Sequence, residues 1–114
     1  SQMAEAFARH RGDGSVRADS AGSAPSGRIN PKAVTHMAEL GIDLAGQRSK
    51  SLEEFREIEF DAVVTMGCGD RCPWIPARIR EDWALPDPRD LGEDGYRAVR
   101  DEIGRRVDDL LRRL

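Results

Sequence analysis

One apolar run constrains the fold of this chain more than any other feature: FDAVVTM at residues 60–66. Val63 and Val64 are adjacent, so a strand formed here presents an apolar side chain on each of its faces. Strands buried on both faces are typical of parallel sheets, whose crossover connections place helices over the sheet. Helical patterns stand on both sides of this run, and the sequence therefore predicts an α/β fold.

Helices are expected in four segments that carry the apolar spacing or the end signals of a helix: 1–10, 31–40, about 52–58 and about 93–113. In the second, Asn30 and Pro31 are typical of an N-cap and a first helical position. Its buried face is assigned to Val34, Met37 and Ala38. The apolar stripe of the last helix is the longest: Tyr96, Val99, Ile103, Val107, Leu110 and Leu114.

Strands are fewer than such a fold needs. A short strand is expected at residues 16–20, where Val16 and Ala18 alternate with polar neighbours. The stretch from residue 67 to residue 88 is expected to be irregular, with a weak strand or turn around 83–85. Two firm strands remain, and the first helix has no strand before it.

Size and charge set the broad class of the protein. Its 114 residues correspond to one domain, and a formal net charge of −3 argues against nucleic-acid or anionic-membrane partners. No stretch approaches the ~20 apolar residues of a transmembrane helix, and no signal-peptide core is visible. Two cysteines do not make a secreted disulfide framework. We therefore expect a cytoplasmic protein.

Two cysteines stand close together directly after the best strand. Cys68 and Cys72 lie in MGCGDRCP, at the carboxyl end of a predicted parallel strand, where ligands bind in open α/β sheets. Three interpretations stay open: two unrelated thiols, half of a metal site, or a redox pair that forms and breaks a disulfide. His10 and His36 have no metal-like spacing to the pair, and Arg71 is placed to stabilise a thiolate.

An aspartate between two prolines is the next candidate. Asp87 stands in the sequence Pro86-Asp87-Pro88. It is interpreted either as an ordinary turn residue or as a general acid held on a rigid loop near the cysteines.

Five other conspicuous side chains receive structural interpretations. Trp74, Trp83 and Phe55 are expected to be packing residues. His10 and His36 are expected on helix surfaces.

Several segments together resemble one known family, in the right order along nearly the whole chain: SQMAEAF (1–7), DSAG (19–22), VTMGCGDRCPWIP (64–76), EDWALPDP (81–88) and RDEIGRRVDDLL (100–111). They resemble the thioredoxin-coupled arsenate reductases of the low-molecular-weight protein tyrosine phosphatase superfamily. The double-cysteine segment is the specific part, whereas SQMAEAF marks only the superfamily. The resemblance implies a flavodoxin-like, three-layer fold with a parallel sheet.

One departure from the family pattern concerns the start of the chain. Family members begin with a central strand and a loop of pattern C-x5-R, which holds the nucleophilic cysteine and an anion-binding arginine. Ser1 corresponds to the serine directly after that arginine. The chain is therefore expected to be a single domain that lacks the first strand, the loop cysteine and the arginine.

The resemblance also implies a mechanism. Arsenate would bind at the helix N-terminus beginning at Ser1, whose hydroxyl lowers the pKa of the loop thiol. The loop cysteine attacks arsenic while Asp87 protonates the departing oxygen. Cys68 then attacks the loop cysteine, Cys72 attacks Cys68, and thioredoxin reduces the resulting disulfide. Each step is thiolate chemistry, so no metal or other cofactor is expected.

Two alternatives and one metal question accompany this hypothesis. The chain could be a low-molecular-weight phosphatase, although the cysteine pair then has no role and Arg89 replaces an aromatic residue common there. It could also be a non-catalytic fragment or pseudo-enzyme. Some relatives bind potassium, and Glu5 and Ser20 match two ligand positions, but Ser51 stands where an acid is expected. No metal is assigned, and Glu5 is expected to be an exposed helix carboxylate.

Overall fold

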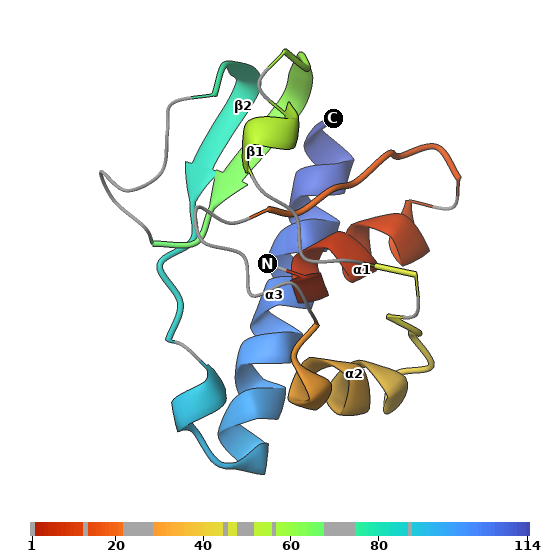
Figure 1. Cartoon of the computed structure of the whole chain (residues 1–114), viewed down its shortest axis with the longest axis vertical. Coiled ribbons are helices and arrows are strands. Elements are labelled where there is room, and N and C mark those ends of the chain that lie inside the picture. The colour runs from red at the N-terminus through yellow and green to blue at the C-terminus, as the bar shows by residue number, and fades with distance from the viewer. Residues whose placement is uncertain are drawn as a thin grey trace.

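The computed structural model describes residues 2–12, 14–21, 29–44, 46–47, 52–55, 57–67, 75–86 and 88–114. Its elements, in chain order, are α1 (Gln2–Arg11), α2 (Pro31–Ala38), the 3-10 turn η1 (Leu52–Phe55), β1 (Phe60–Thr65), β2 (Ala77–Asp82), the 3-10 turn η3 (Pro88–Asp90) and α3 (Glu93–Arg113). In Figure 1, the long α3 rises through the middle of the view to the label C, with α1 and α2 on one side of it and the two strands on the other side, toward its C-terminal end.

The two strands pair in parallel, as the sequence predicts for an α/β fold. The register places Ala62 opposite Ile79 and Val64 opposite Glu81. The arrows of β1 and β2 in Figure 1 point the same way, so their carboxyl ends lie at one edge of the sheet.

The prediction that residues 67–88 are irregular is wrong for Ala77–Asp82, which form β2. Ala77 and Ile79 are half-buried, whereas Arg78 and Arg80 are exposed. This is the period-two pattern of a strand with one solvated face. Its charged outer face hid the alternation, because only two of its six residues are apolar.

Two further strand predictions need correction. No residue of β1 is fully buried, and Asp61 is exposed, so the expectation of burial on both faces is wrong. Residues 16–20 form no strand. A backbone carbonyl of this stretch, that of Ala18, instead accepts a hydrogen bond from Arg9 Nε at 3.0 Å. A strand forms only where a neighbouring strand completes its ladder of hydrogen bonds.

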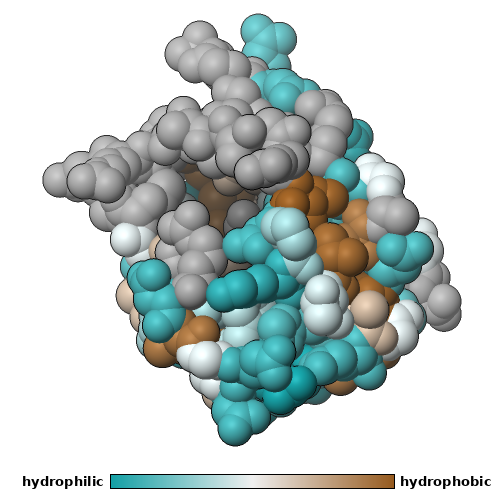
Figure 2. Space-filling view, turned by 60° about the horizontal axis from the view of Figure 1, so that its bottom comes forward, coloured by the Kyte–Doolittle hydropathy of each residue, from teal (hydrophilic) through white to brown (hydrophobic). Residues whose placement is uncertain are grey.

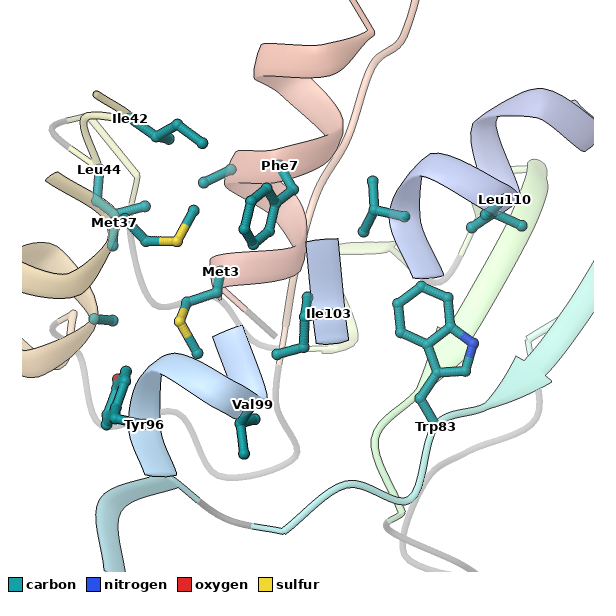
Figure 3. Close-up of a cluster of buried hydrophobic side chains, with 13 residues drawn as sticks. Met3, Phe7, Met37, Ile42, Leu44, Trp83, Tyr96, Val99, Ile103 and Leu110 are labelled. Carbon is teal, nitrogen blue, oxygen red and sulfur yellow. The ribbon is translucent and has the colours of Figure 1, made fainter. Parts of the chain in front are cut away.

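The core lies where α1, α2 and α3 meet. Phe7 and Met37 are completely buried there, and Figure 3 shows both near Met3 and Ile103. A Cβ atom at Gly104 of α3 would lie 3.1 Å from the Phe7 ring. The absence of a side chain at this glycine therefore allows α1 and α3 to approach closely.

The start of α2 follows the sequence prediction, whereas the helix ends at Ala38, two residues before the predicted end at residue 40. The Asn30 side chain accepts a hydrogen bond from the Lys32 backbone N–H at 2.9 Å, and Pro31 is the first helical residue. Gly41 has φ = 76°, a left-handed conformation that suits glycine after a helix.

The predicted buried face of α2 is partly wrong. Met37 is buried as expected, but Val34 is 41% exposed and Ala38 is also exposed. The buried face carries His36 and Ala33 instead. His36, expected on the surface, is only 4% exposed because its ring stacks on Tyr96 of α3, with ring centroids 4.3 Å apart.

The long C-terminal helix is confirmed with nearly the expected bounds. Its buried residues include five of the predicted stripe: Tyr96, Val99, Ile103, Val107 and Leu110. Leu114, which follows the last residue of α3, is 45% exposed, so its predicted place in the buried stripe is wrong. The predicted helix at 52–58 is observed only as the short turn η1.

Few large apolar side chains of the described residues reach the surface. Those exposed are Val34, Leu40, Leu91 and Leu114. Figure 2, with the lower end of Figure 1 turned forward, shows a mainly hydrophilic surface with separate brown groups. Scattered apolar side chains are usual on protein surfaces, and we attach no function to them. No described helix has the length and apolarity required to cross a membrane.

Candidate active site at the carboxyl edge of the sheet

The four site residues predicted from the sequence lie outside the described residues: Ser1, Cys68, Cys72 and Asp87. Trp74 also lies outside them. The structure describes direct neighbours of three of them: Gln2 beside Ser1, Gly67 beside Cys68, and Pro86 and Pro88 on either side of Asp87. The described residue nearest to Cys72 in the chain is Ile75, three positions later. The structure therefore describes the strands and helix from which the predicted site segments extend. The roles of the four residues themselves stay predictions.

Both predicted loops leave the sheet at one edge. Thr65, the last residue of β1, pairs with Asp82, the last residue of β2. Cys68 follows Thr65 by three positions and Asp87 follows Asp82 by five. The segments bearing the cysteines and the aspartate therefore start from neighbouring points at the carboxyl edge, where parallel sheets hold ligands.

The carboxylate of Asp82 on β2 accepts hydrogen bonds from the end of β1 and from the residues after it. Asp82 Oδ1 accepts a hydrogen bond from Thr65 Oγ1 at 2.6 Å and another from the Gly67 backbone N–H at 2.8 Å. The Thr65 hydroxyl, followed by the Gly67 amide, lowers the pKa of the Asp82 carboxyl from its ordinary value. Sequence reasoning missed this residue, although its position between the two candidate loops was visible.

Trp83 anchors the chain that leads toward Asp87. Its side chain is 4% exposed and belongs to the core cluster, on the same side as Leu110 in Figure 3. The indole Nε1–H donates to Glu81 Oε1 at 2.9 Å, and the Trp83 backbone N–H donates to the Thr65 carbonyl at 2.7 Å. The expected packing role of Trp83 is confirmed, and that of Phe55 is confirmed by its 6% exposure.

The helix that would present its N-terminus to an anion carries a buried carboxylate. Glu5, expected to be exposed, is only 3% exposed. The Ser20 hydroxyl donates to Glu5 Oε1 at 2.7 Å, and an Arg9 nitrogen lies 3.1 Å from Glu5 Oε2. A buried carboxylate requires such partners, and the i,i+4 spacing of Glu5 and Arg9 was readable in the sequence.

The described residues hold no group of three or more His, Cys, Asp or Glu side chains arranged for a metal ion. His10 is exposed, as predicted.

The letters of a C-x5-R pattern occur within this chain, away from the position before Ser1 where family members carry their loop. That spacing occurs once, from Cys72 to Arg78. However, Arg78 lies inside β2 and is exposed. An anion-binding loop of this kind leads into a helix N-terminus. The match at residues 72–78 therefore lacks that structural context.

Comparison with known proteins identifies the family. The family described as "Low molecular weight phosphotyrosine protein phosphatase" matches residues 1–114. A glutaredoxin arsenate reductase of Synechocystis sp. is 38% identical, covering 100% of this chain and 88% of the relative. An arsenate reductase of Bacillus subtilis is also 38% identical, covering 94% of this chain and 83% of the relative.

Solved structures agree. An arsenate reductase in the phosphate binding state superimposes with a TM-score of 0.89 at 39% identity, covering 99% of this chain and 88% of the other. A thioredoxin-dependent arsenate reductase of Corynebacterium glutamicum superimposes with a TM-score of 0.78 at 35% identity, covering 98% of this chain and 54% of the other. This chain therefore belongs to the low molecular weight phosphotyrosine protein phosphatase family, and the relatives it matches there include the arsenate reductases.

Proposed function

We propose that the protein reduces arsenate to arsenite through a cysteine thiol–disulfide relay that an external thiol reductant regenerates. The observation that carries this proposal is the full-length similarity to proteins named arsenate reductases, at 38% identity over 117 aligned residues. The arrangement of β1 and β2 supports the proposal, because the chain segments bearing Cys68 and Asp87 start from the same edge of the sheet.

The proposed reaction transfers two electrons from thiols to arsenic. A loop thiolate attacks arsenate and forms an As–S bond, while Asp87 gives a proton to the oxygen that departs as water. Cys68 then attacks the sulfur of that loop cysteine. Arsenite leaves with the electron pair of the As–S bond, and a disulfide joins the two cysteines.

Two exchanges restore the enzyme. Cys72 attacks Cys68, which frees the loop cysteine and leaves a Cys68–Cys72 disulfide. A dithiol reductant then reduces that disulfide. Its two thiols become a disulfide and both protein cysteines become thiols again. These steps require no metal or other cofactor.

By resemblance, the first nucleophile and the anion-binding arginine belong to a C-x5-R loop, which in family members comes directly before the serine that corresponds to Ser1. We propose that the Ser1 hydroxyl donates a hydrogen bond to that thiolate and lowers its pKa. The helix N-terminus that follows would help to bind the oxyanion. Since thiols must stay reduced between cycles, we place the protein in the cytoplasm.

The test measures arsenate-dependent NADPH oxidation by the protein expressed from its complete gene, coupled through thioredoxin and thioredoxin reductase. We expect Cys68→Ser and Cys72→Ser each to abolish turnover, because either change interrupts the relay. The matched control is Ser15→Ala, a change remote in sequence from both loops, which should leave turnover intact. Arsenate reduction that survives in both cysteine variants would overturn the relay.

Two further arms separate the alternatives. With p-nitrophenyl phosphate, a phosphatase should keep its activity in Cys68→Ser, because hydrolysis does not use this pair. Replacing thioredoxin by glutathione and glutaredoxin identifies the reductant, and both chemistries are represented by name among the similar proteins. Asp87→Asn should slow arsenate turnover by roughly 100-fold or more, as expected for loss of a general acid.

A further inference from the structure

We propose that Asp82 is a positioning residue for the redox relay: it fixes the backbone from which Cys68 emerges and thereby favours the Cys68–Cys72 disulfide over the open dithiol. This inference rests on the proposed function, because it requires that the two cysteines form a disulfide. It concerns a residue that the relay chemistry itself does not use.

The contacts that carry the proposal converge on one oxygen atom. Asp82 Oδ1 accepts from Thr65 Oγ1 at 2.6 Å and from the Gly67 backbone N–H at 2.8 Å. Gly67 is covalently bonded to Cys68, and consecutive Cα atoms lie ~3.8 Å apart. The carboxylate on β2 therefore holds the backbone one residue before the first relay cysteine.

The backbone conformation of Gly67 adds a second constraint. Its φ is +77°, in the left-handed region that favours glycine. A Cβ atom at this position would lie 3.4 Å from Ala84 Cα, on the chain that follows β2. The hydrogen bond and the turn together set the direction in which the chain leaves β1.

We expect the anchoring of the Gly67 backbone to change the equilibrium between the Cys68–Cys72 disulfide and the dithiol. Closing the disulfide requires the two Cα atoms to approach to ~4.4–6.8 Å, which costs conformational entropy. An anchor at Gly67 removes part of that freedom from the dithiol in advance, so that less is lost on closure. Asp82 itself is exposed, so we expect its contacts to act locally.

The charge of the acceptor supports this role. Thr65 and Gly67 both donate to the carboxyl group and lower its pKa, so Asp82 is an ionised acceptor at neutral pH. Charge-assisted hydrogen bonds are roughly twice as strong as neutral ones.

The experiment is a glutathione redox titration of the purified chain. The reaction is the Cys68–Cys72 disulfide plus two glutathione thiols, giving two protein thiols plus glutathione disulfide. We expect Asp82→Ala to raise the equilibrium constant for reduction about fivefold, which corresponds to a potential about 20 mV higher for a two-electron couple. Amide hydrogen exchange at Gly67 should accelerate in the same variant.

Three variants define the cause. Asp82→Asn keeps an Oδ1 acceptor and should stay within about twofold of the unmodified chain. Thr65→Val removes only one of the two donors and should give an intermediate shift. Asp61→Ala is the matched control, because it removes an exposed carboxylate from the same sheet and should change nothing.

Each outcome has a distinct meaning. If the unmodified chain forms no Cys68–Cys72 disulfide at any glutathione ratio, the proposed relay fails. If it forms the disulfide but Asp82→Ala leaves the constant unchanged or lowers it, only the positioning role is overturned. An equal shift in Asp61→Ala, or unchanged exchange at Gly67, overturns that role as well. Urea unfolding tests whether each variant is folded. If Asp82→Ala does not fold, Asp82→Ser takes its place, because the serine side chain is too short to make both contacts.

Discussion

The helical part of the molecule and its sheet are held together in different ways. Phe7 and Met37, on α1 and α2, are completely buried, and Leu44 between the elements is nearly so. By contrast, every residue of β1 and β2 keeps part of its surface exposed. Apolar packing dominates where the helices meet, whereas hydrogen bonds to Asp82 and the Trp83 anchor organise the sheet edge. The two parts are therefore stabilised by different interactions: burial of apolar side chains in the helical part, and hydrogen bonds at the carboxyl edge of the sheet.

The largest expected effect on stability is at Phe7, in the helical part of the molecule. Phe7→Ala should lower the free energy of unfolding by about 3–5 kcal/mol, because the ring is completely buried between α1 and α3. Urea denaturation followed by circular dichroism measures this. Leu114→Ala, at a side chain 45% exposed, is the control and should change stability by less than about 0.5 kcal/mol. A loss below about 1 kcal/mol for Phe7→Ala contradicts the packing argument.

Arg100 tests the polar connection within the helical part. Its Nη1 donates to the His36 carbonyl at 2.9 Å and to Glu39 Oε1 at 2.7 Å, joining α3 to α2. Arg100→Met keeps the aliphatic volume but removes these bonds, and should cost about 1.5–3 kcal/mol. Arg105→Met removes an exposed ion pair within α3 and should cost no more than about 0.5 kcal/mol. Equal losses in the two variants would show that burial of Arg100 is unimportant.

Replacing Ile79 tests how much the apolar side of the sheet contributes to the free energy of unfolding, for comparison with Phe7→Ala. Ile79 is half-buried in β2 and packs against the core, so Ile79→Ala should cost only about 1–2 kcal/mol. The neighbouring Arg78→Ala, on the exposed face, should have an effect below about 0.5 kcal/mol. If Ile79→Ala destabilises the protein as much as Phe7→Ala, the proposed difference between the two parts is wrong.

The smallest expected effect is a dependence on pH at Glu39. The hydrogen bond from Arg97, together with that from Arg100, lowers the pKa of Glu39 to about 2 from its ordinary 4.5. A lowered pKa gives stabilisation that is present above pH 4.5 and is lost as the pH falls toward 2. Glu39→Gln should therefore flatten stability against pH in that range, measured by urea midpoints. Glu57→Gln, at an exposed glutamate, should keep the slope of the unmodified chain.

The helices could be predicted well from the sequence, whereas the strands at the edges of the sheet could not. The Asn30–Pro31 start of α2 and the long stripe of α3 were predictable, because caps and helical periodicity are local signals. The strand β2 was missed, since its alternation is carried mostly by charged residues. Glu5 and His36 were placed on the surface wrongly, because their burial depends on Ser20 and Tyr96, which are distant in the chain.

The candidate site also has one part that could be predicted from the sequence and one part that depended on tertiary contacts. The sequence alone supplied the candidate residues Cys68, Cys72 and Asp87, and the relay is proposed for them because the segments that carry them resemble those of the arsenate reductases. Only the tertiary structure decided that the segments carrying them leave one edge, and that Asp82 ties Gly67 to Thr65 there. The physical reason is that parallel pairing and hydrogen bonds across the sheet depend on residues brought together by folding, which no local pattern records.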